Sequence, residues 1–347
     1  MQATIHHKGE TEDRFNEREV AGTLIEGIVF KKLQGHYFVY TGTDTITCSL
    51  SNRLRKYFQY PTSDPASGTL RRVQKVHDIR MVDPVAVGDV VRFIPMDDGT
   101  GHIKDIAPRR NKLMRQAAGE KALEQIIAAN VDQIIPIISA ANPKPKWQML
   151  DRSLAMIESS NIPGLICLTK TDLDKRGKAI ETSQIYEDIG YPVIRSSTVT
   201  GQGIDEFRRA VQGKTSVLIG MSGVGKTTLL NEVQPGLGLK VNEVSQATDK
   251  GKHTTTHLEM FPLDSGGGVV DTPGMKIFGL WDTDPSELAQ LFVEMQPYVS
   301  QCHFGLSCTH THEPNCSVKD AVEEGEISEL RYKNYQKIFQ YIRANGK

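Results

Sequence analysis

A phosphate-binding loop is the clearest chemical feature of the sequence. The segment GMSGVGKT matches the pattern G-x-x-x-x-G-K-[ST], follows an apolar strand-like run and opens a helical one. Glycines let backbone N–H groups wrap phosphate oxygens, the lysine adds a cation, and the threonine hydroxyl can bind Mg²⁺. A chance match would arise in about one chain of this length in a hundred. We predict nucleotide contacts from Gly220, Met221, Ser222, Gly223, Val224, Gly225, Lys226, Thr227 and Thr228.

Two further segments indicate that the bound base is guanine. The segment TKTD ends an apolar run and resembles the guanine-specificity motif of GTPases, which predicts contacts from Thr169, Lys170 and Asp172. A carboxylate accepts from two adjacent donors of guanine, and adenine would leave it unpaired. Ser196 and Ser197 end the next strand-like run and resemble the element whose backbone N–H contacts the guanine oxygen. TKTD alone could be a solvated turn, so the prediction depends on both segments.

Candidates for Mg²⁺ and the γ-phosphate follow the phosphate loop. The segment DTPG resembles D-x-x-G, in which Asp271 would hold Mg²⁺ through water and the Gly274 N–H would contact the γ-phosphate. Between them, the run HTTT offers three threonines, and we choose the middle one, Thr255, as a Mg²⁺ ligand beside Thr227 and Asp271. At least one of the three threonines merely begins the next strand.

The residue after DTPG bears on the rate of hydrolysis. Many GTPases place a water-orienting glutamine there, whereas this chain has Met275, which cannot orient water. The sequence therefore predicts slow intrinsic hydrolysis or a substitute group. His253 is the candidate substitute by its chemistry, and the alternative is a loop histidine that touches a partner. Lys226 and Thr255 complete the predicted catalytic set through positioning and charge neutralisation.

The order of these motifs is circularly permuted. GTPases usually begin with the phosphate loop, but here TKTD and the two serines precede it. A fold tolerates permutation where its original termini lie close together. Strand-like runs such as VDQIIPIIS, GLICLTK and TSVLIG alternate with helical ones, which favours a mostly parallel sheet covered by helices. We predict a permuted α/β P-loop GTPase domain over residues 121–284.

The N-terminal third has a different pattern. Residues 1–19 are polar and aperiodic, which predicts a flexible tail. Between residues 20 and 106, short β-type runs such as TLIEGIVF, HYFVYTG and TITCSL are separated by turns about every ten residues. That spacing is typical of a small all-β barrel. Residues 107–120 read as a linker that leads to a helix.

Positive charge is concentrated in this N-terminal third. The chain carries 41 Lys and Arg against 42 Asp and Glu, a net charge of −1. Residues 20–115 hold 15 basic and 9 acidic residues, whereas residues 116–300 hold 17 and 22. The barrel is therefore the part expected to bind nucleic acid, although each single basic residue could be a solvated surface charge. The candidates for RNA phosphates are Arg53, Arg55, Lys56, Arg71, Arg72, Arg109 and Arg110.

A cysteine and histidine cluster near the C-terminus indicates a metal site. Three thiolates and one imidazole are a full tetrahedral Zn²⁺ set with no open position, which is typical of a structural site. The predicted ligands are Cys302, Cys308, His310 and Cys316. His303 and His312 are alternative ligands, and reduced thiols in a polar loop are the other interpretation. We predict a helical zinc-binding module over residues 285–347.

Together these features resemble the RsgA (YjeQ) family, the small-subunit-dependent ribosomal GTPases of bacteria. The resemblance covers roughly residues 20–345 and rests on the barrel, the permuted motifs and the pattern C-x₅-C-x-H-x₅-C. It implies an OB-type barrel and a role in late maturation of the 30S subunit, with 16S rRNA as partner. It also implies GTP hydrolysis to GDP and phosphate on the subunit, with Mg²⁺ and one structural Zn²⁺ as cofactors. A residue other than glutamine after D-x-x-G also fits the family.

Two other functions remain open from the residues. One is a slow, GTP-switched RNA-binding assembly factor whose partner is not the 30S subunit. Another is a metabolic kinase with an accessory barrel, against which TKTD and the two serines count. No apolar run approaches the roughly 20 residues that span a bilayer, and the start MQATIHHKGE has no apolar signal core. We expect a cytoplasmic monomer with no membrane partner.

Overall fold

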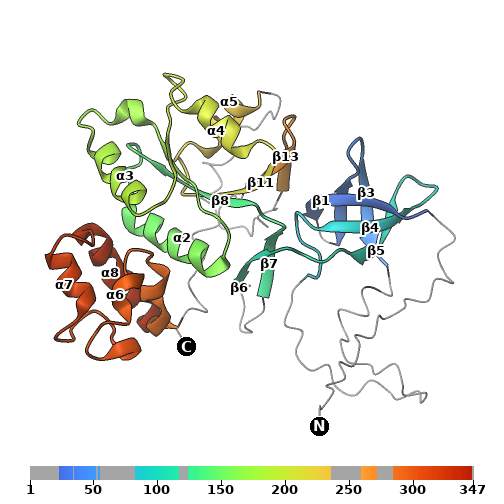
Figure 1. Cartoon of the computed structure of the whole chain (residues 1–347). Coiled ribbons are helices and arrows are strands. Elements are labelled where there is room, and N and C mark those ends of the chain that lie inside the picture. The colour runs from blue at the N-terminus through green and yellow to red at the C-terminus, as the bar shows by residue number, and fades with distance from the viewer. Residues whose placement is uncertain are drawn as a thin grey trace, which may run out of the picture.

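The chain is represented by a computed structural model that describes residues 23–33, 35–51, 54, 83–116, 124–235, 259–271 and 284–345 (Figure 1). Within these ranges, none of the helices combines the length and the apolar character needed to cross a membrane. Several predicted residues lie outside the described part of the chain, as does the predicted tail 1–19. They are Arg53, Arg55, Lys56, Arg71, Arg72, His253, Thr255 and Gly274.

The described strands of the N-terminal third close into a barrel. The order is β1-β2-β3-β5-β4, and β4 pairs back onto β1, with β3 and β5 parallel and the other pairs antiparallel. Alternating side chains such as Val29, Val39 and Phe93 fill the interior. The predicted OB-type barrel is confirmed. Its strands are β1 (Ile25–Leu33), β2 (His36–Tyr40), β3 (Thr45–Leu50), β4 (Val90–Pro95) and β5 (Gly101–Ile106).

The GTPase domain is built on a mostly parallel sheet. Its strand order is β10-β9-β8-β11-β13-β12, and only β12 runs antiparallel to its neighbour β13. Strand β8 is buried along its whole length because helices cover both faces of the sheet. The strands are β8 (Gln133–Ser139), β9 (Ile166–Thr169), β10 (Val193–Arg195), β11 (Lys214–Ile219), β12 (Glu259–Pro262) and β13 (Gly267–Asp271).

Helices on the two faces of this sheet form separate cores. On one face Phe207 of α4 and Leu229 of α5 pack against the strands, and on the other Leu154 of α2 packs with Tyr186 of α3. The predicted alternation of strands and helices is confirmed. The helical elements are α2 (Trp147–Ser160), the short 3₁₀ turn η2 (Thr171–Leu173), α3 (Lys178–Asp188), α4 (Ile204–Val211) and α5 (Lys226–Val233).

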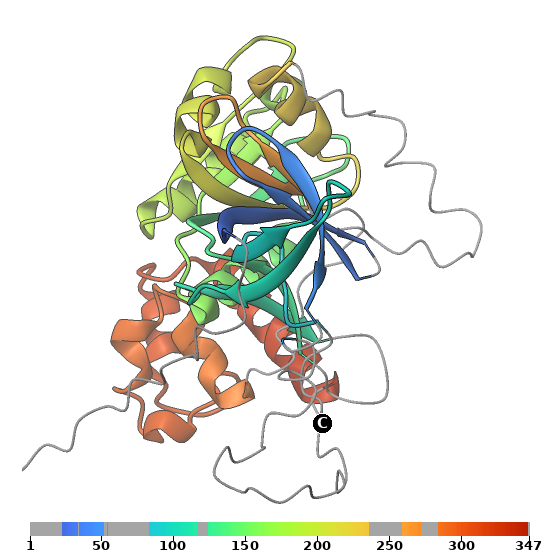
Figure 2. The same cartoon turned by 90° about the vertical axis from the view of Figure 1, so that its right-hand side faces the viewer.

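The barrel and the GTPase sheet are joined edge to edge. Strand β1 pairs antiparallel with β12 at Lys31 and Glu259, so that eleven described strands form one continuous sheet. The side chains of these two residues also form an ion pair at 2.8 Å. Figure 2 shows the blue barrel strands lying beside the orange hairpin of the GTPase domain. The barrel is therefore attached to the GTPase sheet itself.

A two-stranded sheet occupies the predicted linker. Strands β6 (Lys112–Gln116) and β7 (Glu124–Ala129) pair antiparallel, so the expectation of a helix after the linker is wrong for these residues. Leu113 and Ile126 are buried, and burial of these side chains outweighs local helix preference. The domain boundaries given above stay a prediction.

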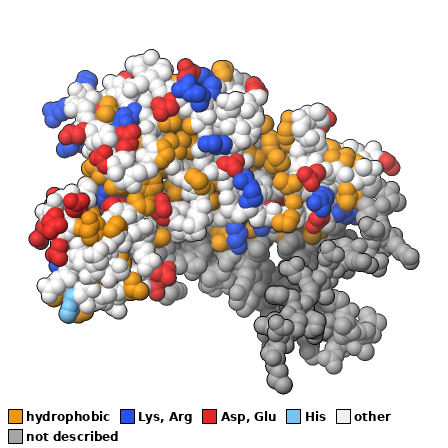
Figure 3. All heavy atoms as spheres, in the orientation of Figure 1, with side chains coloured by type: hydrophobic (Ala, Val, Ile, Leu, Met, Phe, Trp, Pro, Cys, Tyr) orange, Lys and Arg blue, Asp and Glu red, His pale blue; other side chains and the backbone are white. Residues whose placement is uncertain are grey.

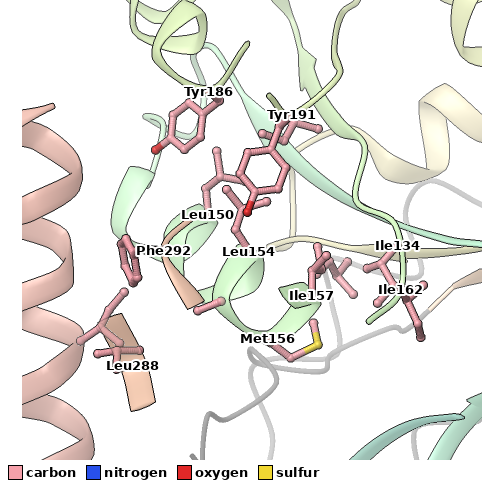
Figure 4. Packing of buried hydrophobic residues seen from close by; sticks show 14 of the residues in the cluster. Ile134, Leu150, Leu154, Met156, Ile157, Ile162, Tyr186, Tyr191, Leu288 and Phe292 are labelled. Carbon is pink, nitrogen blue, oxygen red and sulfur yellow. The ribbon is translucent and has the colours of Figure 1, made fainter. Parts of the chain in front are cut away.

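The C-terminal region is helical and packs on the GTPase domain. Leu288 and Phe292 lie beside Leu150 and Leu154 of α2 in one continuous hydrophobic cluster (Figure 4). Tyr335, Ile338 and Phe339 of the last helix belong to the same cluster, so its apolar side chains also pack against the GTPase domain. The elements are η3 (Pro285–Leu291), α6 (Gln296–Val299), η4 (Gly305–Ser307), α7 (Ser317–Glu323) and α8 (Glu329–Asn345).

Candidate guanine-nucleotide site and metal centre

The phosphate loop connects β11 to the start of α5. An added Cβ at Gly220 would lie 2.6 Å from the carbonyl oxygen of Ile137, so no larger residue fits there. Gly225 has a φ of 97°, which an L-residue rarely adopts, and it stands directly before the first helical residue. The loop therefore delivers the N-terminus of α5, with its unpaired N–H groups, to the place where anions bind.

Lys226 lies within this loop. Its side chain is almost fully buried, and its Nζ donates to the carbonyl oxygens of Gly220 at 2.6 Å and Met221 at 3.0 Å. Burial lowers the pKa of Lys226 from its ordinary value, and the nearby carboxylate of Asp271 opposes that shift. The ammonium group is thus held between the loop and the end of β13, where phosphates and Mg²⁺ would meet.

The guanine motif is bonded to the same loop. Thr169 donates its hydroxyl to the carbonyl oxygen of Val224 at 2.5 Å, and Lys170 donates to the carbonyl oxygen of Gly223 at 2.6 Å and to that of Asn142. Threonine in place of asparagine therefore still ties the motif to the loop. These bonds fix the base-binding and phosphate-binding segments in one rigid frame.

Asp172 is oriented by Ser197. The Ser197 hydroxyl donates to Asp172 Oδ1 at 2.6 Å, and its oxygen accepts from the N–H groups of Val199 and Thr200, both at 3.2 Å. The Ser196 hydroxyl contacts the Cys167 sulfur at 3.6 Å behind the strand. Of the two predicted serines, Ser197 therefore acts on the carboxylate that would bind guanine.

A hollow opens beside Asp172 and reaches the phosphate loop. Three apolar side chains that sequence reasoning missed line it, namely Leu173, Val199 and Leu229. Leu173 is 40% exposed and Val199 81% exposed, although both are large and apolar. Position next to a motif was the available signal, since a flat base needs apolar walls as well as a carboxylate. The full lining is Thr169, Lys170, Asp172, Leu173, Ser196, Thr198, Val199, Gly225, Thr228 and Leu229.

Thr227 and Asp271 are positioned by adjacent elements. Asp271 ends β13, where it pairs with Leu218 of β11, and Thr227 stands in the first turn of α5 after that strand. The negative charge of the Asp271 carboxylate raises the pKa of Lys226, against the effect of burial. A hydroxyl and a carboxylate are oxygen ligands of the kind that Mg²⁺ takes, so these residues fit a magnesium site.

The predicted metal ligands converge in the C-terminal module. Their ligand atoms lie within 4.8 Å of one another, and all of these residues are buried. His310 Nδ1 lies 3.4 Å from the sulfur atoms of both Cys302 and Cys316. The alternatives point elsewhere, since His303 stacks edge-on against Phe304 and His312 contacts Thr311. The converging atoms are those of Cys302, Cys308, His310 and Cys316.

This donor set fits a tetrahedral Zn²⁺ ion. Three sulfur atoms and one ring nitrogen leave no open position. Burial raises the pKa of the Cys308 thiol to about 12, a cost that a bound cation would offset because coordinating thiols are deprotonated. Helix α8 supports the centre, since the Tyr332 and Tyr335 hydroxyls donate to the carbonyl oxygens of His310 and Thr309 at 2.9 Å and 2.8 Å.

Comparison with known proteins identifies the family. The family model described as RsgA GTPase matches residues 106–281. A relative named small ribosomal subunit biogenesis GTPase RsgA, from Phocaeicola vulgatus, is 36% identical over 320 residues, or 91% of this chain and 96% of the relative. This chain belongs to the RsgA GTPase family. It is therefore a GTP hydrolase, and the family implies a guanine nucleotide and Mg²⁺ at the site described above.

Solved structures of RsgA-like proteins share the fold. The crystal structure of YjeQ from Thermotoga maritima matches with a TM-score of 0.70 and 30% identity, over 92% of this chain and 99% of that one. YloQ, described as a circularly permuted GTPase, matches with a TM-score of 0.66 and 29% identity, over 96% and 99%. The predicted RsgA resemblance and the permuted fold are confirmed.

The two described RNA candidates have different surroundings. Arg109 makes two bonds to the fully buried Asp89, at 2.6 Å and 2.7 Å, and one to the carbonyl oxygen of Pro84. Arg110 pairs with Asp132 at 2.8 Å, and its side chain is 63% exposed. The charge of Arg109 is thus used within the protein, while Arg110 remains accessible to a phosphate.

Proposed function

We propose that this RsgA GTPase binds the small (30S) ribosomal subunit, acts in its late maturation and hydrolyses GTP to GDP and phosphate when docked. The observation that carries the proposal is family membership over nearly the whole chain, since the relative from Phocaeicola vulgatus is named for small ribosomal subunit biogenesis. We further propose that the protein acts in the cytoplasm as a monomer, without a membrane partner. The permuted site supplies the nucleotide chemistry.

The barrel is the proposed RNA-binding part. The N-terminal third carries the excess of Lys and Arg, and 16S rRNA offers a dense row of phosphates. By contrast, Figure 3 shows acidic side chains gathered over the C-terminal helices near α7. Arg110 is proposed to contact an RNA phosphate. Arg109 instead stabilises the fold through its ion pair with the buried Asp89. The other candidates are Arg53, Arg55, Lys56, Arg71 and Arg72.

In the proposed mechanism the chain binds and orients the nucleotide. Asp172, held by Ser197, accepts the guanine donors, while Lys170 covers the base. Lys226 and the N–H groups of the phosphate loop neutralise charge that develops on the phosphates. Mg²⁺, which Thr227 and Asp271 would hold, supplies further charge neutralisation when it is bound.

The remaining catalytic assignments concern residues outside the described ranges. Thr255 would complete the Mg²⁺ shell, and the Gly274 N–H would contact the γ-phosphate. His253 would orient the attacking water in place of the glutamine that Met275 replaces. One structural Zn²⁺ on the three cysteines and His310 completes the proposed cofactors.

The test is GTP turnover by the purified protein, alone and with added ribosomal subunits. Small subunits should raise turnover at least tenfold, and large subunits should not. Equal turnover with both subunits would overturn the proposal. Binding of small subunits without stimulated turnover would favour a slow, GTP-switched assembly factor, and absence of binding would move the partner to another RNA.

A further inference from the structure

Three charged residues stand in one row across the junction of the barrel and the GTPase sheet. Glu259 of β12 is the register partner of Lys31 of β1 on one side and of Asp271 of β13 on the other. Both strand pairs are antiparallel, so directly opposite side chains share a face and lie about 5 Å apart at Cβ. The row runs from the barrel to the proposed magnesium residue.

The charges along this row are unbalanced without the barrel. Lys31 Nζ lies 2.8 Å from Glu259 Oε2, and the two side chains are 30% and 35% exposed. On the other side of Glu259 stands a second carboxylate, that of Asp271, which interacts electrostatically with the Lys226 ammonium group. Like charges directly opposite each other repel, so Lys31 neutralises a charge that would otherwise act on Asp271.

We propose that Glu259 is a positioning residue that couples the barrel to the magnesium–nucleotide site, with Lys31 as the barrel's half of the coupling. The inference rests on the proposed role of Asp271. When Lys31 moves away, the Glu259 carboxylate adds negative potential beside Asp271, and Mg²⁺ is held more tightly. Coupling between two sites is reciprocal, so bound Mg²⁺ loosens the Lys31–Glu259 contact by the same factor.

The first test measures the release rate of a fluorescent GDP from the purified protein across a Mg²⁺ titration. Lys31→Met should lower the Mg²⁺ concentration that half-maximally slows release, by roughly three- to tenfold. Glu259→Gln should raise it by a similar factor. The double variant should return near the wild-type value, because the net charge beside Asp271 is restored.

The controls are Arg92→Met and Asp105→Asn, which remove the positive and the negative half of an exposed ion pair elsewhere in the barrel. Neither should shift the Mg²⁺ midpoint. Equal or parallel shifts for Lys31→Met and Glu259→Gln would overturn the proposal, since a loss of packing moves both in one direction. Retained binding of the fluorescent GDP shows that each variant is folded.

A second test follows hydrogen exchange of the β1 and β12 amides with GDP, in the presence of Mg²⁺ or of a chelator. Mg²⁺ should speed exchange at Lys31 and Glu259 and leave the β2–β3 pair unchanged; unchanged exchange at the junction would contradict the reciprocal coupling. Neither test contains a ribosomal subunit. A failure here therefore leaves the docking proposal standing, and a failure of subunit stimulation leaves this coupling standing.

Discussion

Arg331 of α8 donates to Asp151 of α2 at 2.7 Å, across 180 residues of chain, and the two side chains are 1% and 0% exposed. Arg331 also forks onto both carboxylate oxygens of Glu294, at 2.7 Å and 2.9 Å. Burial alone would lower the pKa of Arg331. The carboxylates of Asp151 and Glu294 raise this pKa by more than burial lowers it, so the guanidinium stays charged. Asn334 and Tyr186 donate to the remaining positions on Asp151.

This network should hold the C-terminal module on the GTPase domain. Arg331→Met would leave two buried carboxylates without their cation, and we expect a loss of about 3–5 kcal/mol in the free energy of unfolding. Urea unfolding followed by Trp147 fluorescence measures it, because Trp147 stacks on Tyr186 at 5.6 Å. Every variant in this comparison, including the reference, carries Trp281→Phe, so that Trp147 is the only tryptophan.

The matched control is Lys333→Met on the same helix. Lys333 pairs with Glu329 at 2.7 Å, but the side chains are 57% and 72% exposed. Exposed pairs contribute little, so we expect a change within about 0.5 kcal/mol. Similar losses in the two variants would show that the buried network has no special role.

Guanine selectivity should depend on the carboxylate of Asp172. Asp172→Asn replaces an acceptor by a donor, and we expect GDP affinity to fall roughly 100-fold or more. The amide can instead donate to the second carbonyl of xanthine, so binding of xanthosine diphosphate should improve. Asp174→Asn is the control, because Asp174 accepts from the N–H groups of Ala179 and Ile180 at the start of α3. Equal GDP binding in both variants would remove Asp172 from the base site.

The metal centre can be tested by measuring the zinc content of the purified protein. We expect about one Zn²⁺ per chain, and almost none in Cys316→Ser, because a tetrahedral structural site tolerates no missing ligand. Cys48→Ala removes a thiol that is equally buried, but in the barrel, and should leave the zinc content unchanged. Elemental analysis of the purified proteins measures both. Full zinc content in Cys316→Ser would bring His303 or His312 back as ligands.

We expect the two arginines that follow the barrel to have different roles, Arg109 in stability and Arg110 in RNA binding. Arg109→Ala leaves the buried carboxylate of Asp89 without its cation, and we expect about 3 kcal/mol of destabilisation. Arg110→Ala should leave stability within about 1 kcal/mol. If Arg110 contacts a phosphate, a plot of the logarithm of the small-subunit binding constant against the logarithm of salt concentration should have a slope that is shallower by about one in Arg110→Ala. An unchanged slope would remove Arg110 from the interface.

Local motifs made much of this protein predictable. The phosphate loop, TKTD and the Cys/His cluster are short segments whose residue types and spacing already define their chemistry. The strands of the barrel and the alternating strands and helices of the GTPase domain were predictable, because apolar residues recur with the period of a strand or of a helix. The permuted order also follows from the sequence, since it is only the order of the motifs.

The features that sequence reasoning missed depend on distant contacts. The segment AAGEKALEQ contains good helix formers, yet the described residues beside it pair as β6 and β7. Arg109 looked available for RNA until folding brought Asp89, twenty residues earlier, against it. The role of Ser197 depends on which way a turn directs its hydroxyl, and Lys31 meets Glu259 from 228 residues away.

The pairing of β1 with β12 has a consequence for how the chain can be divided. Strand β12 lies at the edge of the GTPase sheet, next to β1 of the barrel. Removing the barrel would therefore expose the backbone donors and acceptors of that edge. Uncovered edges recruit other strands and promote aggregation. A truncated chain that begins after the barrel would thus be prone to stick to itself, and low solubility of such a fragment would reflect a lost strand neighbour rather than a misfolded GTPase domain.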